Sequence, residues 1–331
     1  EFQNNNERAV DVELVNGGSQ LAVLSNVQRG TTNICIYLLG QDGNLIDSLY
    51  IDEPINQVAK SISQASDNGF LITGYKDPDP ARNPYLPPPD LADILLLKVN
   101  SNLDLVTDLS PGGGEHVGSG VKSFEVSFDE DIYYLVFGYS DRPRKEGSAD
   151  YQMCFQLIAS HTSGTPTGLQ GVSAGEMSEE QVASAAIKIP PAVGDGYLMI
   201  GTTSSGASSD LYLTRFGKLS GPLDAKPIFD SKIPIGARIE GISAANASPD
   251  GYFVLANEIR ENNKRDIYLL RVERDGAVSW TASFGSLDGE DTAGGIEVLS
   301  DGRIAVVGTI QLETQKKIAL IITNPNGGFS D

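Results

Sequence analysis

The chain has 331 residues, 40% of them hydrophobic, so it is long enough for one large all-β domain or two ordinary domains. Its formal net charge is −20, which would repel a phosphate backbone and argues against nucleic acid as a partner. No stretch approaches the roughly 18 uninterrupted apolar residues of a membrane-spanning helix. The 36 glycines and 17 prolines indicate many short strands joined by turns.

A turn followed by a β-rich run returns along the whole chain. It is "NGGSQLAVLS" from Asn16, "NGFLITGY" from Asn68, "DEDIYYLVFGY" from Asp129, "DGYLMIGT" from Asp195, "DGYFVLAN" from Asp250 and "DGRIAVVGT" from Asp301. These are six copies at a period of about 50 to 64 residues, which is typical of repeat architectures.

Each copy is flanked by further short strands. An apolar run follows it, as in "NICIYLLGQDGNL" from Asn33 and "DIYLLRVERDGAV" from Asp266, where Asp275-Gly276 is a hairpin turn. A fourth strand comes next, for example the segment with Trp280 and Phe284. A strand rich in small residues precedes each copy, such as "VASAAIKI" from Val182. Because sheets crowd together at a central axis, we expect the small-residue strand to be innermost and the strand with Trp280 to be outermost.

Four short strands repeated six times predict an all-β fold, a six-bladed β-propeller of four-stranded antiparallel blades in one domain, 1–331. The predicted blades are residues 8–55, 56–114, 115–179, 180–236, 237–289, and 290–331 together with 1–7. The last copy lacks a fourth strand of its own, and we expect the N-terminal segment to supply it and close the ring. Deleting Glu1 to Asn6 should then lower the melting temperature by more than trimming a frayed tail would. A seven-bladed ring would need a further blade between Ser160 and Val182, which is too short for four strands.

The segments "DGYLMIGT", "DIYLLRVERDGAVSW" and "FGSLDGEDTAGGIEVLSDGRIAVVGT" resemble the bacterial propeller repeats of the general form DGGYxxxG…DxxLxKxDxxGxxxWxxxFGG. The resemblance is clear in copies two, four, five and six and poor in copies one and three. These repeats occur in secreted or lipid-anchored proteins, most of them uncharacterised. The resemblance therefore implies a propeller that is exported to the periplasm or cell surface after removal of a signal peptide. A lipid anchor would sit on a residue absent from this chain. The motif builds turns and carries no catalytic residues.

A propeller binds ligands at the mouth of its channel, on loops that lead into the innermost strands. The residues just before those strands are polar and rich in donors, so they are our candidate ligand-binding residues: Arg8, Gln57, His116 with the preceding Glu115, Gln181, Arg238 and Asp291. Such a ring suits a carboxylate, a sugar or a peptide. The alternative is that this position is simply the solvated loop end of every blade.

Two insertions are the candidate surface for a protein partner. Residues 76–93 are proline-rich, and residues 140–150 are the most basic stretch of an acidic chain. Both fall between the second and third strands of adjacent copies. The candidate partner residues within them are Arg82, Tyr85, Arg142, Arg144 and Lys145. A decorated loop with no partner remains the alternative.

Metal and thiol chemistry have little support. No Cys and His cluster has zinc-ligand spacing, and the acidic turns that begin at Asp77, Asp129 and Asp288 lack the full calcium-loop pattern. We expect no cofactor, with calcium at one of these turns as the weaker alternative. Cys35 and Cys154 lie in apolar runs of non-adjacent copies, so we expect two buried free thiols.

Two hypotheses for function stay open. The first is an exported, non-catalytic propeller that binds an unknown protein or glycan. The second is a carbohydrate-active enzyme, a glycan hydrolase or lyase, with its site at the channel mouth. The chain has only two histidines, His116 and His161, so nucleophilic catalysis with a histidine base is poorly supported.

Overall fold

The computed structural model describes most of the chain. The described residues are 6–77, 92–110, 118–128, 131–140, 151–159, 172–174, 179–191, 194–205, 208–219, 227–234, 238–247, 251–287 and 289–329. They form strands, turns and one short 3-10 turn at Asn16–Gly18. None of the helical structure in this described part is long and apolar enough to cross a lipid bilayer.

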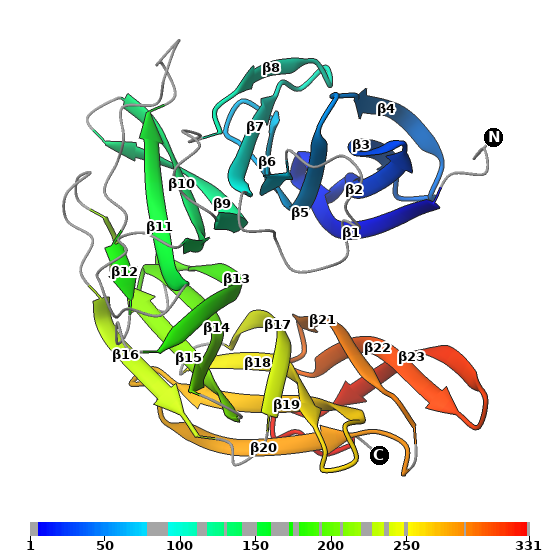
Figure 1. Ribbon diagram of the computed structural model, residues 1–331, viewed down its shortest axis with the longest axis vertical. Coiled ribbons are helices and arrows are strands. Elements are labelled where there is room, and N and C mark those ends of the chain that lie inside the picture. The colour runs from blue at the N-terminus through cyan, green and yellow to red at the C-terminus, as the bar shows by residue number, and fades with distance from the viewer. Residues whose placement is uncertain are drawn as a thin grey trace. The chain divides into compact units, whose positions relative to one another are not determined.

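Six antiparallel sheets follow one another in chain order (Figure 1). Blade one contains β1 (Asn6–Val15), β2 (Gln20–Arg29), β3 (Thr31–Gly40) and β4 (Leu45–Ile51). Blade two contains β5 (Asn56–Gln64), β6 (Phe70–Asp77), β7 (Asp93–Val99) and β8 (Leu105–Asp108). Blade three contains β9 (Gly118–Phe128), β10 (Asp131–Ser140), β11 (Gln152–Ala159) and β12 (Val172–Ala174).

The second half repeats this order. Blade four contains β13 (Glu180–Ile189), β14 (Gly196–Ser205), β15 (Ser208–Phe216) and β16 (Pro227–Ile233). Blade five contains β17 (Arg238–Ala247), β18 (Gly251–Ile259), β19 (Arg265–Glu273) and β20 (Val278–Phe284). Blade six contains β21 (Thr292–Val298), β22 (Ile304–Leu312) and β23 (Gln315–Thr323).

The predicted all-β fold, a six-bladed β-propeller, is confirmed by these sheets. In the described residues, blade six has three strands, as expected from the sequence. The segment predicted to complete it begins with residues 1–5, which lie outside the described residues. Asn6 and Glu7 belong to β1 and pair with Gln28 and Val27. Both insertions fall where predicted, between β6 and β7 and between β10 and β11.

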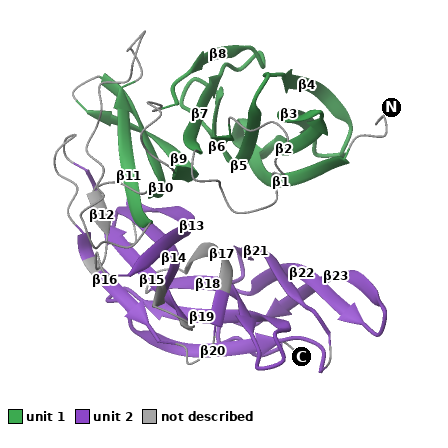
Figure 2. Cartoon of the chain, in the orientation of Figure 1, with its two compact units in different colours: residues 1–146, 150–173, 221–223 green, residues 147–149, 174–220, 224–331 purple. Residues whose placement is uncertain are grey.

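The chain divides into two compact units (Figure 2). Unit 1 comprises residues 1–146, 150–173 and 221–223 and carries blades one to three. Unit 2 comprises the remaining residues and carries blades four to six. Within each unit, the first strand of one blade contacts the first strand of the next.

Continuous apolar strands form the cores because neighbouring blades cover both faces of a middle blade. In unit 1, Leu95 and Leu97 of β7 pack toward blade one, whereas Ile94 and Leu96 pack toward blade three. In unit 2, Val254 of β18 packs with blade four, whereas Phe253 and Leu255 pack with blade six. Burial on both faces explains why these strands are apolar at consecutive positions rather than alternate ones.

Polar side chains also join neighbouring blades. The Asn26 amide on β2 donates to Ala59 O at 3.0 Å and accepts from Ala59 N at 2.8 Å, on β5 of the next blade. In unit 2, Asn257 Oδ1 on β18 accepts a hydrogen bond from Ala293 N on β21 at 2.6 Å. Each asparagine is buried, so these bonds give its side chain the partner that a buried polar group requires.

Three side-chain predictions are confirmed. Trp280 lies on β20, the edge strand of blade five, and packs against residues of blade six. Cys35 and Cys154 are buried free thiols. Burial raises the pKa of both, that of Cys154 to about 12.

Candidate functional site

A β-bulge recurs in the first strand of every blade and gives a common register for the candidate residues. In β5, for example, Ala59 pairs with Gly74 and Ser61 pairs with Thr73, which leaves Lys60 without a partner. The unpaired residues in chain order are Val10, Lys60, Val121, Ser184, Gly241 and Gly294. Bulges of this kind redirect side chains and often lie beside binding sites.

The bulge also explains the glycine at the end of the repeat. Gly74, Gly138, Gly201 and Gly308 each pair with the residue just before the bulge. A β-carbon on Gly74 would overlap the carbonyl oxygen of Val58, and one on Gly138 would overlap that of Ser119. At Gly74 and Gly138 the bulged backbone approaches too closely for a side chain, whereas blades one and five carry Ser25 and Asn257 at the same register.

Four of the sequence-predicted residues share one register. Gln57, Gln181, Arg238 and Asp291 each stand three positions before the bulge of their blade. Gln57, Gln181 and Asp291 are buried, with 2%, 0% and 0% exposure, whereas Arg238 is exposed. The simple interpretation as solvated loop ends therefore fails for three of the four.

The register corrects two of the sequence equivalences. In blade one, Arg8 stands two positions before the bulge, so its neighbour Glu7 is the equivalent residue. In blade three, the equivalent residue is Gly118 rather than His116. The sequence alignment failed in these two blades because they match the repeat poorly and their strand starts carry no clear motif.

Some predicted residues lie outside the described residues: Glu115 and His116 of the channel-mouth set, and the whole partner-loop set of Arg82, Tyr85, Arg142, Arg144 and Lys145. Their roles stay predictions. Of the acidic turns, Asp129 and Asp288 also lie outside. In the described part of the chain, no group of three or more His, Cys, Asp or Glu side chains is placed to hold a metal ion.

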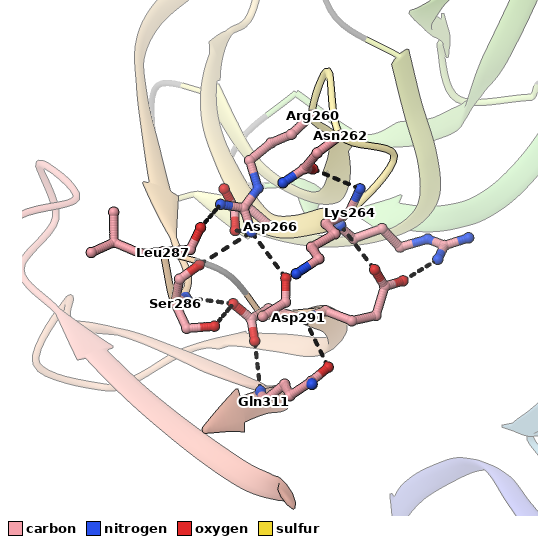
Figure 3. Close-up of polar contacts among 11 residues, drawn as sticks. Arg260, Asn262, Lys264, Asp266, Ser286, Leu287, Asp291 and Gln311 are labelled. Carbon is pink, nitrogen blue, oxygen red and sulfur yellow. Dashed lines mark hydrogen bonds and ion pairs between the residues drawn. The ribbon is translucent and has the colours of Figure 1, made fainter. Parts of the chain in front are cut away.

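Asp291 is the best-defined of the predicted residues, and it organises one end of blades five and six (Figure 3). Its carboxylate accepts hydrogen bonds from Ser286 N at 2.5 Å, Ser286 Oγ at 3.0 Å and Gln311 N at 2.7 Å. The donors come from the loop after β20 and from β22. Asp291 therefore joins two segments that are 25 residues apart in the sequence.

Arg260 holds the same loop from the turn between β18 and β19. Its guanidinium donates to Leu287 O at 2.9 Å, Ser286 O at 3.1 Å and Gly289 O at 3.0 Å (Figure 3). Arg260 Nη2 also lies 3.0 Å from Asp266 Oδ1. The loop is thus fixed along its main chain, while the Leu287 side chain projects outward with 92% exposure.

Two carboxyl groups lie close together beside this loop. A β-carbon on Gly285 would overlap Asp266 Oδ1 and stand 2.8 Å from Asp291 Oδ2. Burial raises the pKa of Asp266, the Asp291 carboxylate raises it further, and Arg260 opposes both effects. Glycine at 285 provides the room for this arrangement.

A cavity of about 730 Å³ opens next to the loop after β20 that Arg260 and Asp291 hold. Polar and apolar surface line it in about equal measure. The lining residues come from the loop and from the β22–β23 hairpin: Ser286, Gly289, Gln311, Leu312, Glu313, Thr314, Gln315 and Lys317. Gln311 links the two sides, because its Oε1 accepts from Glu290 N at 3.1 Å and its Nε2 donates to Glu313 O at 3.1 Å. Hydrogen bonds through Gln311 therefore join the two walls of the cavity.

Sequence reasoning found Asp291 but missed Arg260, Asp266, Gln311 and the cavity. Arg260 is a surface-type residue in the turn after β18 and Gln311 is one on β22, and only the fold brings them to the loop. The one sequence signal was the acidic, glycine-rich segment that ends at Asp291.

No family model matches this chain, and no curated protein matches it. Among solved structures, it is similar to an α-L-arabinanase of Penicillium chrysogenum complexed with arabinobiose, with a TM-score of 0.53 and 12% identity over 96% of this chain and 94% of the other. It also matches the haemagglutinin-neuraminidase ectodomain of parainfluenza virus 5 (TM-score 0.47, 10% identity, 98% and 78% coverage). A third match is an exo-β-1,3-galactanase of Phanerochaete chrysosporium (TM-score 0.45, 9% identity, 86% and 62% coverage). At these identities, the likeness to the arabinanase shows the fold alone.

Proposed function

We propose that this protein is a carbohydrate-recognising β-propeller that binds a short glycan in the cavity beside Asp291. The observation that carries the proposal is the cavity itself. Its volume of about 730 Å³ lies within the usual range of ligand pockets, about 300 to 1,000 Å³. This is room for a short oligosaccharide.

The lining suits sugar hydroxyls. Hydroxyl and amide groups of Ser286, Thr314 and Gln315 both donate and accept hydrogen bonds, as sugar hydroxyls do. Leu312 is exposed and offers apolar contact for a sugar ring face. The fixed loop lowers the entropic cost of binding because its main chain is already ordered by Arg260 and Asp291.

The experiment measures binding with arabino-, galacto- and xylo-oligosaccharides by calorimetry and thermal shift. Gln315→Leu removes a polar lining group and should weaken binding about tenfold, which corresponds to about 1.4 kcal/mol. Gln28→Leu on β2 changes a glutamine that does not line the cavity, so it is the matched control and should leave affinity unchanged. Absence of saturable binding to any of these glycans, or an equal loss in both variants, would contradict the proposal.

Glycoside hydrolysis is a second candidate function. The pairing of Asp266, with its raised pKa, and the nearby Asp291 carboxylate supports it, because glycosidases use an acid and a carboxylate together. The arabinanase with the similar fold is itself named for arabinan cleavage. Asp291 has no exposed surface, however, and its oxygens are engaged by internal donors. For that reason binding is the preferred function.

Release of reducing sugar distinguishes the two candidates. Turnover that Asp266→Asn abolishes while the variant stays folded would favour hydrolysis at this site. Turnover lost in Glu115→Gln or His116→Ala would instead place the chemistry at the channel mouth predicted from the sequence. Saturable binding without turnover would favour a binding protein.

We also propose that the protein works outside the cytoplasm. The sequence resemblance to exported propeller repeats supports this location. Fractionation of cells that express the full-length gene tests it, and recovery in the cytoplasmic fraction would contradict it.

A further inference from the structure

A positively charged residue recurs near the end of the third strand in three blades. Lys98 on β7, Arg215 on β15 and Arg271 on β19 each pair with the residue two positions after the glycine that precedes the second strand. Lys98 and Arg215 are buried, with 5% and 8% exposure. Burying a charge is costly unless an anion accompanies it, so each blade has to supply a partner for this cation.

Two of the three cations have a carboxylate in their own blade. In blade two, Lys98 Nζ lies 2.6 Å from Oδ1 of Asp67, in the turn before β6. In blade five, the Arg271 guanidinium lies 5.0 Å from the centre of the Phe253 ring, and its Nε lies 3.8 Å from Glu273 Oε1. The usual partner of the cation at this position is therefore an acidic side chain close by.

Arg215 of blade four lacks such a partner. Its Nε has no acceptor among the described residues, and its Nη2 makes one long hydrogen bond, to Gly194 O at 3.4 Å. No described carboxylate lies within 4.0 Å of its guanidinium, and the acid of the adjacent turn, Asp195, lies 3.7 Å from Lys218 instead. The blade thus holds a buried guanidinium whose charge is not offset by the residues that the structure describes.

The side chain that would pair with Arg215 is missing from the turn. Gly194 stands two residues before the glycine that precedes β14, where blade two has Asp67. A β-carbon on Gly194 would stand 2.6 Å from Arg215 Nη2. Chain neighbours aside, it would meet no other described residue within 4 Å. The space in front of the guanidinium is therefore open at the place where blade two holds a carboxylate.

A second unused donor lies in the same interface between blades four and five. Tyr252 of β18 belongs to the same core cluster as Leu198, which is the cross-strand partner of Arg215. Tyr252 is only 2% exposed, and its hydroxyl has no hydrogen-bond partner in the described part of the chain. Burial raises the pKa of Tyr252 while the Arg215 charge opposes this, so the hydroxyl keeps its proton at neutral pH and can donate it.

We propose that Arg215 binds a small carboxylate anion in the space beside Gly194. A planar guanidinium matches a carboxylate through two parallel hydrogen bonds, and the bound anion would offset the buried charge as Asp67 does for Lys98. Arg215 keeps 8% exposure, so solvent reaches part of its side chain. The site shares no residue with the cavity beside Asp291 and does not depend on the function proposed for that cavity.

The experiment titrates the full chain at neutral pH with sodium acetate and, separately, with acetamide, which has the same shape and no charge. Sodium chloride keeps the ionic strength constant. The signal is the NMR resonance of the Arg215 Nε–H group in protein labelled at arginine, assigned by its loss in Arg215→Met. We expect a saturable shift with acetate and none with acetamide. No saturable shift with acetate, or an equal shift with acetamide, would overturn the proposal.

Variants test the site by calorimetry with acetate. Arg215→Met and Arg215→Gln should each weaken the affinity at least tenfold. Both remove a buried charge and leave no partner carboxylate behind, so both should unfold at the same urea concentration as the parent chain or a higher one. Arg271→Met, at the equivalent position of blade five, is the matched control and should leave the affinity unchanged. A loss in Arg271→Met as large as that in Arg215→Met would contradict a site at Arg215.

Discussion

Blades two and six carry different polar side chains at the same register position, just before or at the start of the first strand. Gln57 and Asp291 both stand three residues before a bulge, and both are buried. Asp291 accepts three hydrogen bonds from Ser286 and Gln311, whereas Gln57 Oε1 has no donor among the described residues. The repeat thus specifies the position of this side chain but not the hydrogen bonds that it makes. Those bonds depend on loops that differ between blades.

The largest effect should come from breaking the Asp291 network. Asp291→Ala leaves three half-buried donors without an acceptor and opens a void at a fully buried position, so it should lower the free energy of unfolding by about 3 kcal/mol. Urea unfolding measures it. Asp52→Ala, an exposed aspartate in unit 1, is the control and should change stability by less than about 0.5 kcal/mol. An Asp291 variant as stable as the control would show that the loop does not depend on this carboxylate.

The next-largest loss of stability, of similar size, should come from adding a side chain to the repeat glycine that pairs beside the bulge. In Gly74→Ala the new β-carbon meets the Val58 carbonyl oxygen, and the main chain has to shift. We expect a loss of about 3 kcal/mol, at the upper end for overpacking. Gly295→Ala in β21, directly after the bulge of blade six, has open space around its β-carbon and is the matched control. Equal stability of the two variants would argue against the steric role of the repeat glycine.

Replacing Gln57 should raise the free energy of unfolding, whereas replacing Asp291 should lower it. Gln57→Met keeps the length of the side chain and removes an unsatisfied buried acceptor, so stability should rise by about 1 kcal/mol. Urea unfolding again measures it. A loss of stability instead would mean that Gln57 Oε1 receives a hydrogen bond from a group outside the described residues.

Cys35 and Cys154 should not react with a thiol reagent in the folded protein. Burial raises the pKa of the Cys35 and Cys154 thiols, so neither forms the reactive thiolate near about pH 8. A thiol reagent should leave the native protein unlabelled and label both cysteines after unfolding. Rapid labelling of the native state would show that unit 1 opens locally around β3 or β11.

The sequence predicts the fold well because the determinants of a blade are local. Turn residues such as Asp275 and Gly276, apolar runs and the terminal glycine of the repeat all act within one copy. The candidate site is predicted only in part, because its determinants are not local. The position of Asp291 just before β21 marks it in the sequence, but Arg260 reaches the loop from the turn after β18 and Gln311 reaches it from β22. The misplaced equivalents in blades one and three, Arg8 and His116, show the same limit, since a bulge leaves no mark in a sequence without the repeat motif.

The recurring bulge has a consequence for how such a chain can acquire new specificity. One residue per blade is freed from cross-strand pairing, and at present these residues range from glycine to valine, serine and lysine. Val10 packs against the core of unit 1, and a β-carbon on Gly294 would stand 3.0 Å from Val307 O, so these two positions are constrained. A library restricted to codons 60 and 184 would explore ligand preference at a smaller cost to folding.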